Sequence, residues 1–305
     1  MRTRHPRLPP LAPIPMKDRL SLIYLEYGEL DVQDGSFVLV DTNGIRTQIP
    51  VGGVACLMLE PGTRVSHAAV KLAADVGCLL VWVGESGVRL YSAGRPGGAR
   101  SDRLLHQAAT AMDPEARLRV VRRMFAIRFN EEIPEHLTVN RLRGLEGIRV
   151  KRLYAEFAEE YDVDWRGRRY DPGNWSSADI PNRCLSSATA CLYGVVESGV
   201  LAAGYSPSIG FLHTGHPLSF VFDIADLFKF ETVVPVSFRI AAEYPRHPEK
   251  EVRHACRDMF REQKILNRII PTIQDVIDAG GLDSPKPHHD AVPPAYEQEK
   301  PTWDS

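Results

Sequence analysis

The sequence of 305 residues predicts an α+β protein, with a β-rich N-terminal domain followed by an all-helical C-terminal domain. In the first third, short and partly alternating apolar runs are separated by pairs such as Asp34-Gly35 and Asn43-Gly44, a pattern typical of β-hairpins. A stretch rich in Gly and Arg follows at 94–101. After Asp102 the apolar residues recur with the 3.6-residue period of helices.

The elements expected in the N-terminal part are short strands and one helix. The strands are expected at 22–25, 29–33, 36–41, 46–49, 54–59, 78–83 and 88–91. The helix is expected at 66–74, where Ser66 has the side chain that commonly accepts the first free backbone N–H groups. The N-terminal part therefore predicts a sheet structure with a single helix inserted.

The C-terminal part is expected to be helical throughout. Helices are predicted near 103–112, 114–129, 138–160, 179–203, 223–244, 249–267 and 270–279. The resulting organisation is an N-terminal arm at 1–16, a β-rich domain at 17–95, a hinge at 96–102, a helical domain at 103–283 and a Pro-rich flexible tail at 284–305.

Charge and composition exclude several functional classes. The net charge of −2 gives no overall attraction for nucleic acid. The segment Arg117–Arg152, however, has ten Arg or Lys and four Glu, which fits contact with a phosphate backbone or, alternatively, a solvated helix face. G-x-S-x-G, a Walker A loop and G-x-G-x-x-G after a strand are all missing, so the α/β-hydrolase, P-loop NTPase and dinucleotide-binding classes find little support.

Cysteine usage and hydropathy predict a cytoplasmic protein. The five cysteines are odd in number and form no C-x-x-C pair, which favours buried thiols in a reducing compartment. The first 15 residues contain no apolar stretch of a secretory signal. The apolar runs, such as 78–83, are short for crossing a membrane, so no membrane association is expected.

The segment from Gly210 to Lys229 is the strongest candidate for a functional site. An apolar stretch enters a turn at 214–217, a second apolar stretch returns, and the chain is expected to become helical near Asp223. This path would bring His213 close to Asp223 and Asp226, which share one face of a helix. One imidazole and two carboxylates suit Mg²⁺ or Mn²⁺. Alternatively, Asp223 is an N-cap, Asp226 complements the helix dipole, and His213 is a hydrogen-bonded core residue.

Glu146 is the second candidate. It lies on or beside the apolar face of the helix expected at 138–160, where an ionised carboxylate needs a partner. That partner is either a metal ion or one of the many nearby arginines. Gly144 and Gly147 flank Glu146 and weaken a helix, which suggests that another chain segment or a ligand approaches closely here.

A turn-rich loop at 161–175 interleaves arginines with aromatic residues. Stacking platforms for bases combined with phosphate contacts have this composition. A loop whose aromatic residues pack into the core of the same chain has it as well, and the sequence leaves both interpretations open.

The sequence resembles the CRISPR-associated integrases, the first-numbered Cas family, and specifically their type I-E branch. The resemblance extends from about Leu11 to Gly280. It is carried by long stretches at 17–19, 49–52, 58–69, 81–85, 96–102, 167–172 and 213–226. Such a match is far more specific than a short motif.

The resemblance implies roles for the candidate residues. It implies a β-rich dimerisation domain at 17–95, a catalytic helical domain at 103–283, and a Mg²⁺ or Mn²⁺ site with Glu146, His213 and Asp226 as ligands. Asp223 matches a second acid of the family's catalytic site. Positions associated with DNA contact match at Tyr27, Arg64, Arg89, Arg168, Tyr170 and Tyr193.

Two departures from the family are visible. Relatives have a lysine after the Thr-Gly pair, whereas this chain has His216, so the DNA contact expected there should be weaker or pH-dependent. The tail after Gly280 also differs, although in the family it helps to read the motif beside the protospacer. The sequence therefore does not predict which motif beside the protospacer this chain recognises.

The implied function is integration of protospacer DNA into a CRISPR repeat by 3′-OH transesterification. The implied partners are DNA, a second copy of the chain and the small second-numbered Cas protein. Two alternatives remain: a non-catalytic subunit that measures DNA within the same complex, and a general metallonuclease acting on branched DNA.

Overall fold

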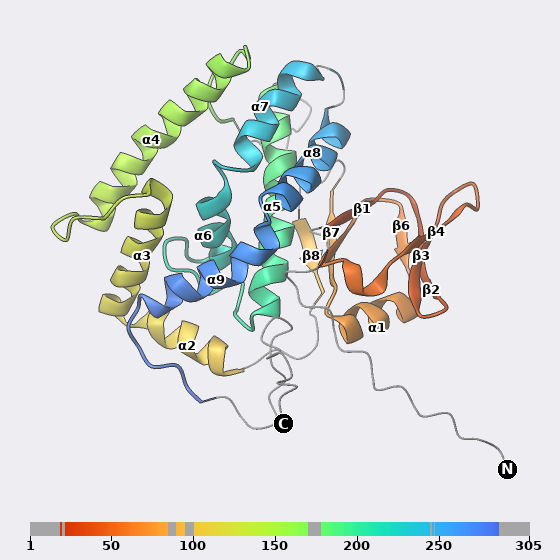
Figure 1. Cartoon of the computed structure of the whole chain (residues 1–305), viewed down its shortest axis with the longest axis horizontal. Coiled ribbons are helices and arrows are strands. Elements are labelled where there is room, and N and C mark those ends of the chain that lie inside the picture. Colours follow the sequence, from red (N-terminus) through yellow and green to blue (C-terminus); the bar gives the residue numbers. More distant parts are fainter. Residues whose placement is uncertain are drawn as a thin grey trace, which may run out of the picture.

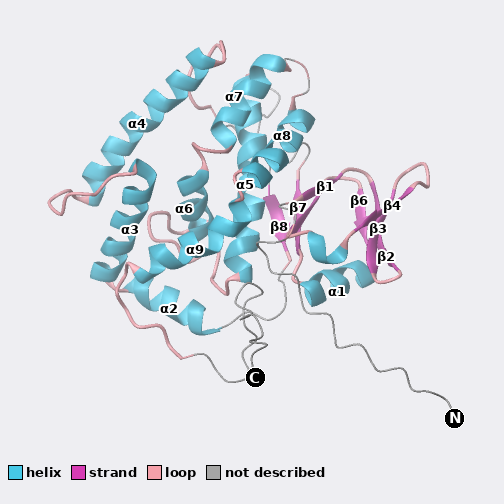
Figure 2. Cartoon of the chain, in the orientation of Figure 1, coloured by secondary structure: helices cyan, strands magenta, loops and turns pink. Residues whose placement is uncertain are grey.

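The computed structural model describes residues 19, 22–84, 90–94, 101–169, 178–244, 246 and 248–286. In these ranges two small sheets precede a group of helices, so the expected α+β fold is confirmed (Figures 1 and 2). The expected N-terminal arm, most of the hinge at 96–102 and all but the first three residues of the tail lie outside the described residues.

The strands form two four-stranded sheets with orders β1-β5-β7-β8 and β4-β3-β2-β6. Their bounds are β1 Ile23–Leu25, β2 Gly28–Gln33, β3 Ser36–Val40, β4 Arg46–Ile49, β5 Cys56–Leu59, β6 Thr63–Val65, β7 Leu79–Val83 and β8 Leu90–Ala93. The expected hairpin joins β2 to β3, and both turn residues, Asp34 and Gly35, have the positive φ that a tight hairpin turn requires. The three-residue strand β6 was not expected from the sequence.

Helix α1 (His67–Val76) begins as predicted. The Oγ of Ser66 accepts a hydrogen bond from the backbone N–H of Ala69 at 3.1 Å. The helix ends at Gly77, which has φ of 66°. Its buried residues Ala69 and Ala73 pack in a core with residues of both sheets, so α1 helps to join the two sheets.

The helices of the C-terminal part are α2 Ser101–Met112, α3 Pro114–Phe129, α4 Val139–Glu160, α5 Ile180–Ala202, α6 Ser219–Phe228, α7 Val233–Glu243, α8 Glu249–Glu262 and α9 Ile265–Asp278. The single helix expected at 223–244 is two helices, and the first begins four residues earlier. The break expected near 268 lies instead at Lys264, whose φ of 49° is left-handed, and Pro271 lies inside α9.

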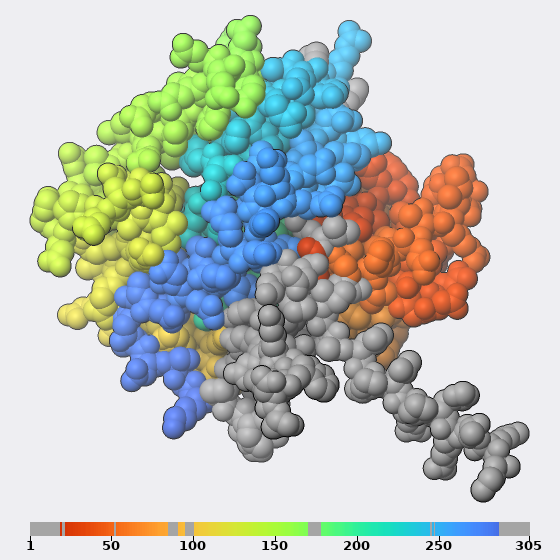
Figure 3. All heavy atoms as spheres, in the orientation of Figure 1, coloured from red at the N-terminus to blue at the C-terminus, as the bar shows by residue number. Residues whose placement is uncertain are grey.

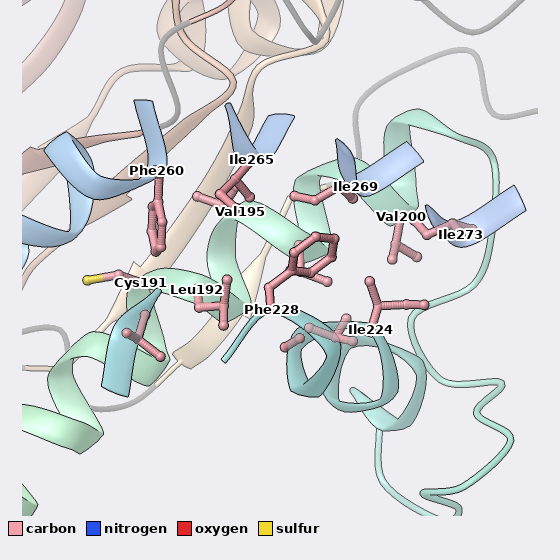
Figure 4. Close-up of a cluster of buried hydrophobic side chains, with 14 of the residues drawn as sticks. Cys191, Leu192, Val195, Val200, Ile224, Phe228, Phe260, Ile265, Ile269 and Ile273 are labelled. Carbon is pink, nitrogen blue, oxygen red and sulfur yellow. The ribbon is translucent and has the colours of Figure 1, made fainter. Parts of the chain in front are cut away.

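Helix α5 is the centre of the helical part. Its side chains contact α6, α8 and α9, and Figure 4 shows Val195 and Val200 among residues of these helices. A Cβ atom on Gly199 would lie 2.4 Å from Ile269, so α5 and α9 approach closely at this glycine. Helix α5 has the length and hydropathy of a membrane span, but 89% of that window is buried within the protein, as in a core helix.

The sheet containing β5 packs directly on α5. The hydroxyl of Tyr24 lies 3.2 Å from the Sγ of Cys191, and the Oγ of Ser198 donates to the carbonyl oxygen of Ala55 at 3.1 Å. Arg253 of α8 lies 3.3 Å from Glu60. One hydrophobic cluster contains residues of both the β-rich and the helical parts. The surfaces of the two parts meet in the space-filling view (Figure 3).

Candidate metal centre

Asp223 organises the loop that precedes α6. Its Oδ2 accepts hydrogen bonds from the backbone N–H groups of Phe211 (2.6 Å) and Leu212 (3.1 Å), and its Oδ1 accepts one from that of His213 (2.9 Å). The Asp223 residue is only 2% exposed. Three successive backbone N–H groups converging on one carboxylate offset the cost of burying its charge. Because α6 begins at Ser219, the alternative that Asp223 is an N-cap is wrong.

The same carboxylate orients the imidazole of His213. The Nδ1 of His213 lies 2.7 Å from Oδ1 of Asp223, and this hydrogen bond raises the pKa of His213. With the Nδ1 proton directed at Asp223, the neutral ring presents a lone pair at Nε2. A carboxylate that holds the opposite ring nitrogen in this way is the usual support of a metal-binding histidine.

Two arginines fix the other side of this loop. Arg117 of α3 donates to the carbonyl oxygen of Phe211, and Arg143 of α4 donates to that of Leu212, both at 2.9 Å. A Cβ atom on Gly210 would lie 2.3 Å from the carbonyl oxygen of His213, so this position has no room for a larger residue. The loop is therefore held by three helices, and His213 is held with it.

Glu146 and Asp226 lie on either side of an arginine that the sequence did not single out. Nη2 of Arg128, in the last turn of α3, forms an ion pair with Glu146 and lies 3.7 Å from Oδ2 of Asp226. Lys229 lies 3.8 Å from the other oxygen of Asp226. Burial raises the pKa of Glu146, and the Arg128 charge offsets part of that rise. Of the two partners that the sequence allows for Glu146, a metal ion or an arginine, the arginine is therefore present.

Glu146 and Asp226 both approach one nitrogen atom of Arg128, and electrostatic interactions connect both of them with His213. The charges of His213 and Asp226 both act on the pKa of Glu146. Two carboxylates and one imidazole are donors that fit Mg²⁺ or Mn²⁺. Within the part of the chain that the structure describes, however, no group of three or more His, Cys, Asp or Glu side chains is arranged to hold a metal ion. The guanidinium of Arg128 lies where the carboxylates would meet a cation.

The face of α4 beside Glu146 is open. A Cβ atom added to Gly144 or Gly147 would meet nothing within 4 Å. The expectation that another segment of the chain approaches these glycines is therefore wrong for the described residues. The other expectation, that a ligand approaches them, fits this open face.

Replacing Gly144 or Gly147 by Ala should stabilise the free protein by about 0.5–1 kcal/mol, because alanine is the better residue inside a helix and the added methyl group meets no neighbour. If DNA lies against this face, the same methyl groups should weaken DNA binding. Urea unfolding and fluorescence anisotropy measure the two effects. A Gly147→Ala variant that is more stable and binds DNA as tightly as the wild type would contradict the approach of DNA here.

The candidate DNA contacts of the β-rich part are exposed. Tyr27 is 62% exposed, and Arg64 is exposed in β6, paired with Glu29 of β2. Strands β2 and β6 lie on the opposite side of the molecule from α3 and α4 (Figure 1). Arg89 lies outside the described residues.

The loop after α4 is pinned to the protein over its described length. Trp165 packs with its ring centroid 5.2 Å from those of Tyr154 and Phe238. Arg168 donates hydrogen bonds to the side-chain oxygens of Asn182 and Ser186, both at 2.9 Å. Up to 169 the loop therefore follows the core-pinned alternative, and the Arg168 guanidinium has protein partners. Tyr170 lies outside the described residues.

Aromatic rings adjoin His213. Phe222 has its ring centroid 4.8 Å from those of Tyr193 and His216, and 5.9 Å from that of His213. His216 is exposed, and its Nδ1 accepts a hydrogen bond from the backbone N–H of Leu218 at 3.0 Å. Tyr193 and His216 are thus brought to the candidate centre. Phe222 was missed, because an apolar residue in an apolar segment gives no separate signal.

Comparison with known proteins identifies relatives along most of the chain. The family model for the CRISPR-associated protein Cas1 matches residues 22–132 and 126–244. A CRISPR-associated endonuclease Cas1 from Geobacter sulfurreducens is 65% identical over 287 residues, covering 94% of each chain. One from Escherichia coli is 61% identical, again covering 94% of each. A crystal structure of a TtCas1–DNA complex has a TM-score of 0.77 at 41% identity, covering 84% of this chain and 91% of that one.

Proposed function

The chain belongs to the Cas1 family of CRISPR-associated proteins, and from this membership we propose that it is a divalent-metal-dependent DNA endonuclease and integrase. It would insert protospacer DNA into the repeat array by 3′-OH transesterification. The observation that carries the proposal is the pairing of Glu146 and Asp226 with one guanidinium nitrogen of Arg128, beside the loop in which Asp223 orients His213.

The residues of the centre have separate tasks. Glu146, His213 and Asp226 would hold the ion, and Asp223 would keep the Nε2 of His213 directed into the centre. When bound, Mg²⁺ or Mn²⁺ polarises a phosphate and lowers the pKa of the attacking hydroxyl group. In joining, the 3′-OH of the incoming fragment attacks a phosphodiester at the repeat edge and the original 3′-OH leaves, so one ester replaces another without ATP. With water as nucleophile, the same arrangement would nick branched DNA.

The partners follow from the family and from the distribution of charge. The DNA complex of the 41% identical TtCas1 and the local excess of positive charge at Arg117–Arg152 support DNA as substrate. We also propose that the β-rich part mediates homodimerisation, that the small Cas2 protein is a partner, and that the protein acts in the cytoplasm.

The two alternative functions make different demands on the centre. A purely DNA-measuring subunit needs no acids around an oriented histidine, and the complete set Glu146, His213, Asp223 and Asp226 argues against it. A general branched-DNA nuclease needs the same centre but no integration of a 3′-OH end. The products formed from one substrate pair distinguish these functions.

A strand-transfer assay tests the proposal. Labelled fragment and a plasmid containing the repeat are incubated with the protein, with and without the small partner, in Mg²⁺, Mn²⁺ or EDTA. We expect covalent joining in either metal, loss of joining in EDTA, and recovery when Mn²⁺ is restored in excess. DNA binding without joining in every condition would favour the measuring subunit, and nicking of branched DNA without joining would favour the general nuclease.

A further inference from the structure

Arg128 is a largely buried cation at the candidate metal centre. Its side chain is 9% exposed, and the side chains of its partners Glu146 and Asp226 are 17% and 18% exposed. The arginine comes from α3 and its two partners come from α4 and α6. One guanidinium group therefore links the three helices that surround the loop containing His213.

The two carboxylates need a positive charge between them. At this degree of burial, two like charges close together repel strongly and lose part of their hydration. The planar guanidinium group can donate to both carboxylates at once, which the point charge of a lysine ammonium does less well. In the protein without a divalent ion, Arg128 supplies this charge.

A divalent ion would need the same carboxylate oxygens. Oε1 of Glu146 and Oδ2 of Asp226 are the atoms that face Arg128. An oxygen atom that coordinates Mg²⁺ directly lies about 2.0–2.1 Å from the ion, which leaves no room for a guanidinium group between the ligands. The two cations therefore exclude each other from the space between Glu146 and Asp226.

We propose that Arg128 is an internal counter-ion of the metal centre: it holds Glu146 and Asp226 in place in the metal-free protein and releases them when a divalent cation binds. The inference rests on the proposed function, since it assumes that these acids are ligands. Arg128 is thus a positioning residue with two opposite effects. It stabilises the metal-free protein and lowers its affinity for the metal.

Metal binding to the purified full-length chain, without DNA, directly measures the second effect, which is the lowered affinity for the metal. Isothermal titration with Mn²⁺ is performed on the wild type, Arg128→Gln, Arg128→Lys and a matched control, Arg149→Gln. Arg149 is a more exposed arginine of α4 that lies 3.7 Å from Glu131. We expect Arg128→Gln to bind Mn²⁺ about tenfold more tightly than the wild type, because a competing charged hydrogen bond is lost. Arg128→Lys should be intermediate, and Arg149→Gln should match the wild type.

Thermal unfolding measures the first effect, the stabilisation of the metal-free protein by Arg128. Without metal, Arg128→Gln should have a lower Tm than the wild type, and Mn²⁺ should raise the Tm of this variant more than that of the wild type. If Arg128→Gln does not fold without metal, the same comparison is made with Arg128→Lys. A purely structural role of Arg128 would lower the Tm without increasing the affinity for Mn²⁺.

The outcomes separate this inference from the proposed function. If the wild type binds Mn²⁺ and Arg128→Gln binds it equally or less tightly, the counter-ion role is overturned while the metal centre stands. If the wild type and the Arg128 variants all fail to bind Mn²⁺, the metal centre itself is wrong and the counter-ion role fails with it. If Arg128→Gln binds Mn²⁺ more tightly and the double variant with Glu146→Gln loses this gain, both the metal centre and the counter-ion role are supported.

Discussion

Glu146→Ala should lower the rate of strand transfer by a factor of about 10³ or more while binding of the DNA fragment survives. A catalytic metal ion contributes several kcal/mol to transition-state stabilisation, and about 1.4 kcal/mol corresponds to a factor of ten in rate. DNA binding in general depends instead on many phosphate contacts, to which we expect the basic residues of α3 and α4 to contribute. Joining is measured on the labelled fragment and binding by anisotropy at one fixed salt concentration.

A matched control is Glu131→Ala. Glu131 is an exposed acid that pairs with Arg149 at 3.7 Å, so its removal deletes one negative charge from the same region without altering the centre. It should join DNA like the wild type. Because Glu146→Ala also leaves Arg128 with Asp226 as its remaining partner at the centre, the Tm of both variants has to be compared. Undiminished joining by a folded Glu146→Ala variant in Mn²⁺ would show that Glu146 is not a metal ligand.

Local signals predicted the fold wherever the responsible residues are close in sequence. Ser66 caps α1 and Asp34-Gly35 forms the hairpin turn, because each acts on backbone groups a few residues away. The start of α6 was misplaced because its N-cap, Leu218, has no side-chain cap hydrogen bond, whereas Asp223 further along is a residue type common at N-caps. Likewise Lys264 gives no sequence signal for its left-handed conformation.

In the candidate site too, contacts between residues close in sequence were predicted, whereas contacts between distant segments were not. The out-and-back path between His213 and Asp223 spans ten residues, and their contact was foreseen from the turn between them. The ion pair of Arg128 with Glu146 depends on how α3 and α4 cross, which the hydrophobic pattern of either helix does not specify. The ten basic residues of Arg117–Arg152 give the segment its positive charge, but the sequence provides no means of selecting Arg128 from among them.

Glu197 is a buried acid that the sequence analysis did not identify as a candidate. It belongs to α5 and is 4% exposed, and its Oε2 has no hydrogen-bond partner among the residues that the structure describes. It lines a cavity of about 500 Å³ together with Ser206, Ser208 and His216. Burial raises the pKa of Glu197 from 4.5 to about 7. Because burial disfavours the ionised form, this carboxyl group favours unfolding once the solution pH allows it to ionise.

The sign of the pH effect follows from the two pKa values. Between pH 4.5 and about 7 the carboxyl group of Glu197 is ionised in the unfolded chain and protonated in the folded one, so stability falls as the pH rises through this window and levels off above it. From pH 5 to pH 8 the loss from this residue should be about 2–3 kcal/mol, since one pKa unit corresponds to about 1.4 kcal/mol. Glu197→Gln cannot ionise and should lose this part of the pH dependence.

Urea unfolding at pH 5, 6, 7 and 8 measures the difference in free energy of unfolding between Glu197→Gln and the wild type. This difference should shift by about 2–3 kcal/mol in favour of the variant across the series, whatever its value at pH 5, because the buried amide has its own constant cost. Glu115→Gln is the control, since the Glu115 side chain is 90% exposed and should leave the pH profile unchanged. Parallel profiles for Glu197→Gln and the wild type would mean that water or another group in the cavity stabilises the ionised carboxylate.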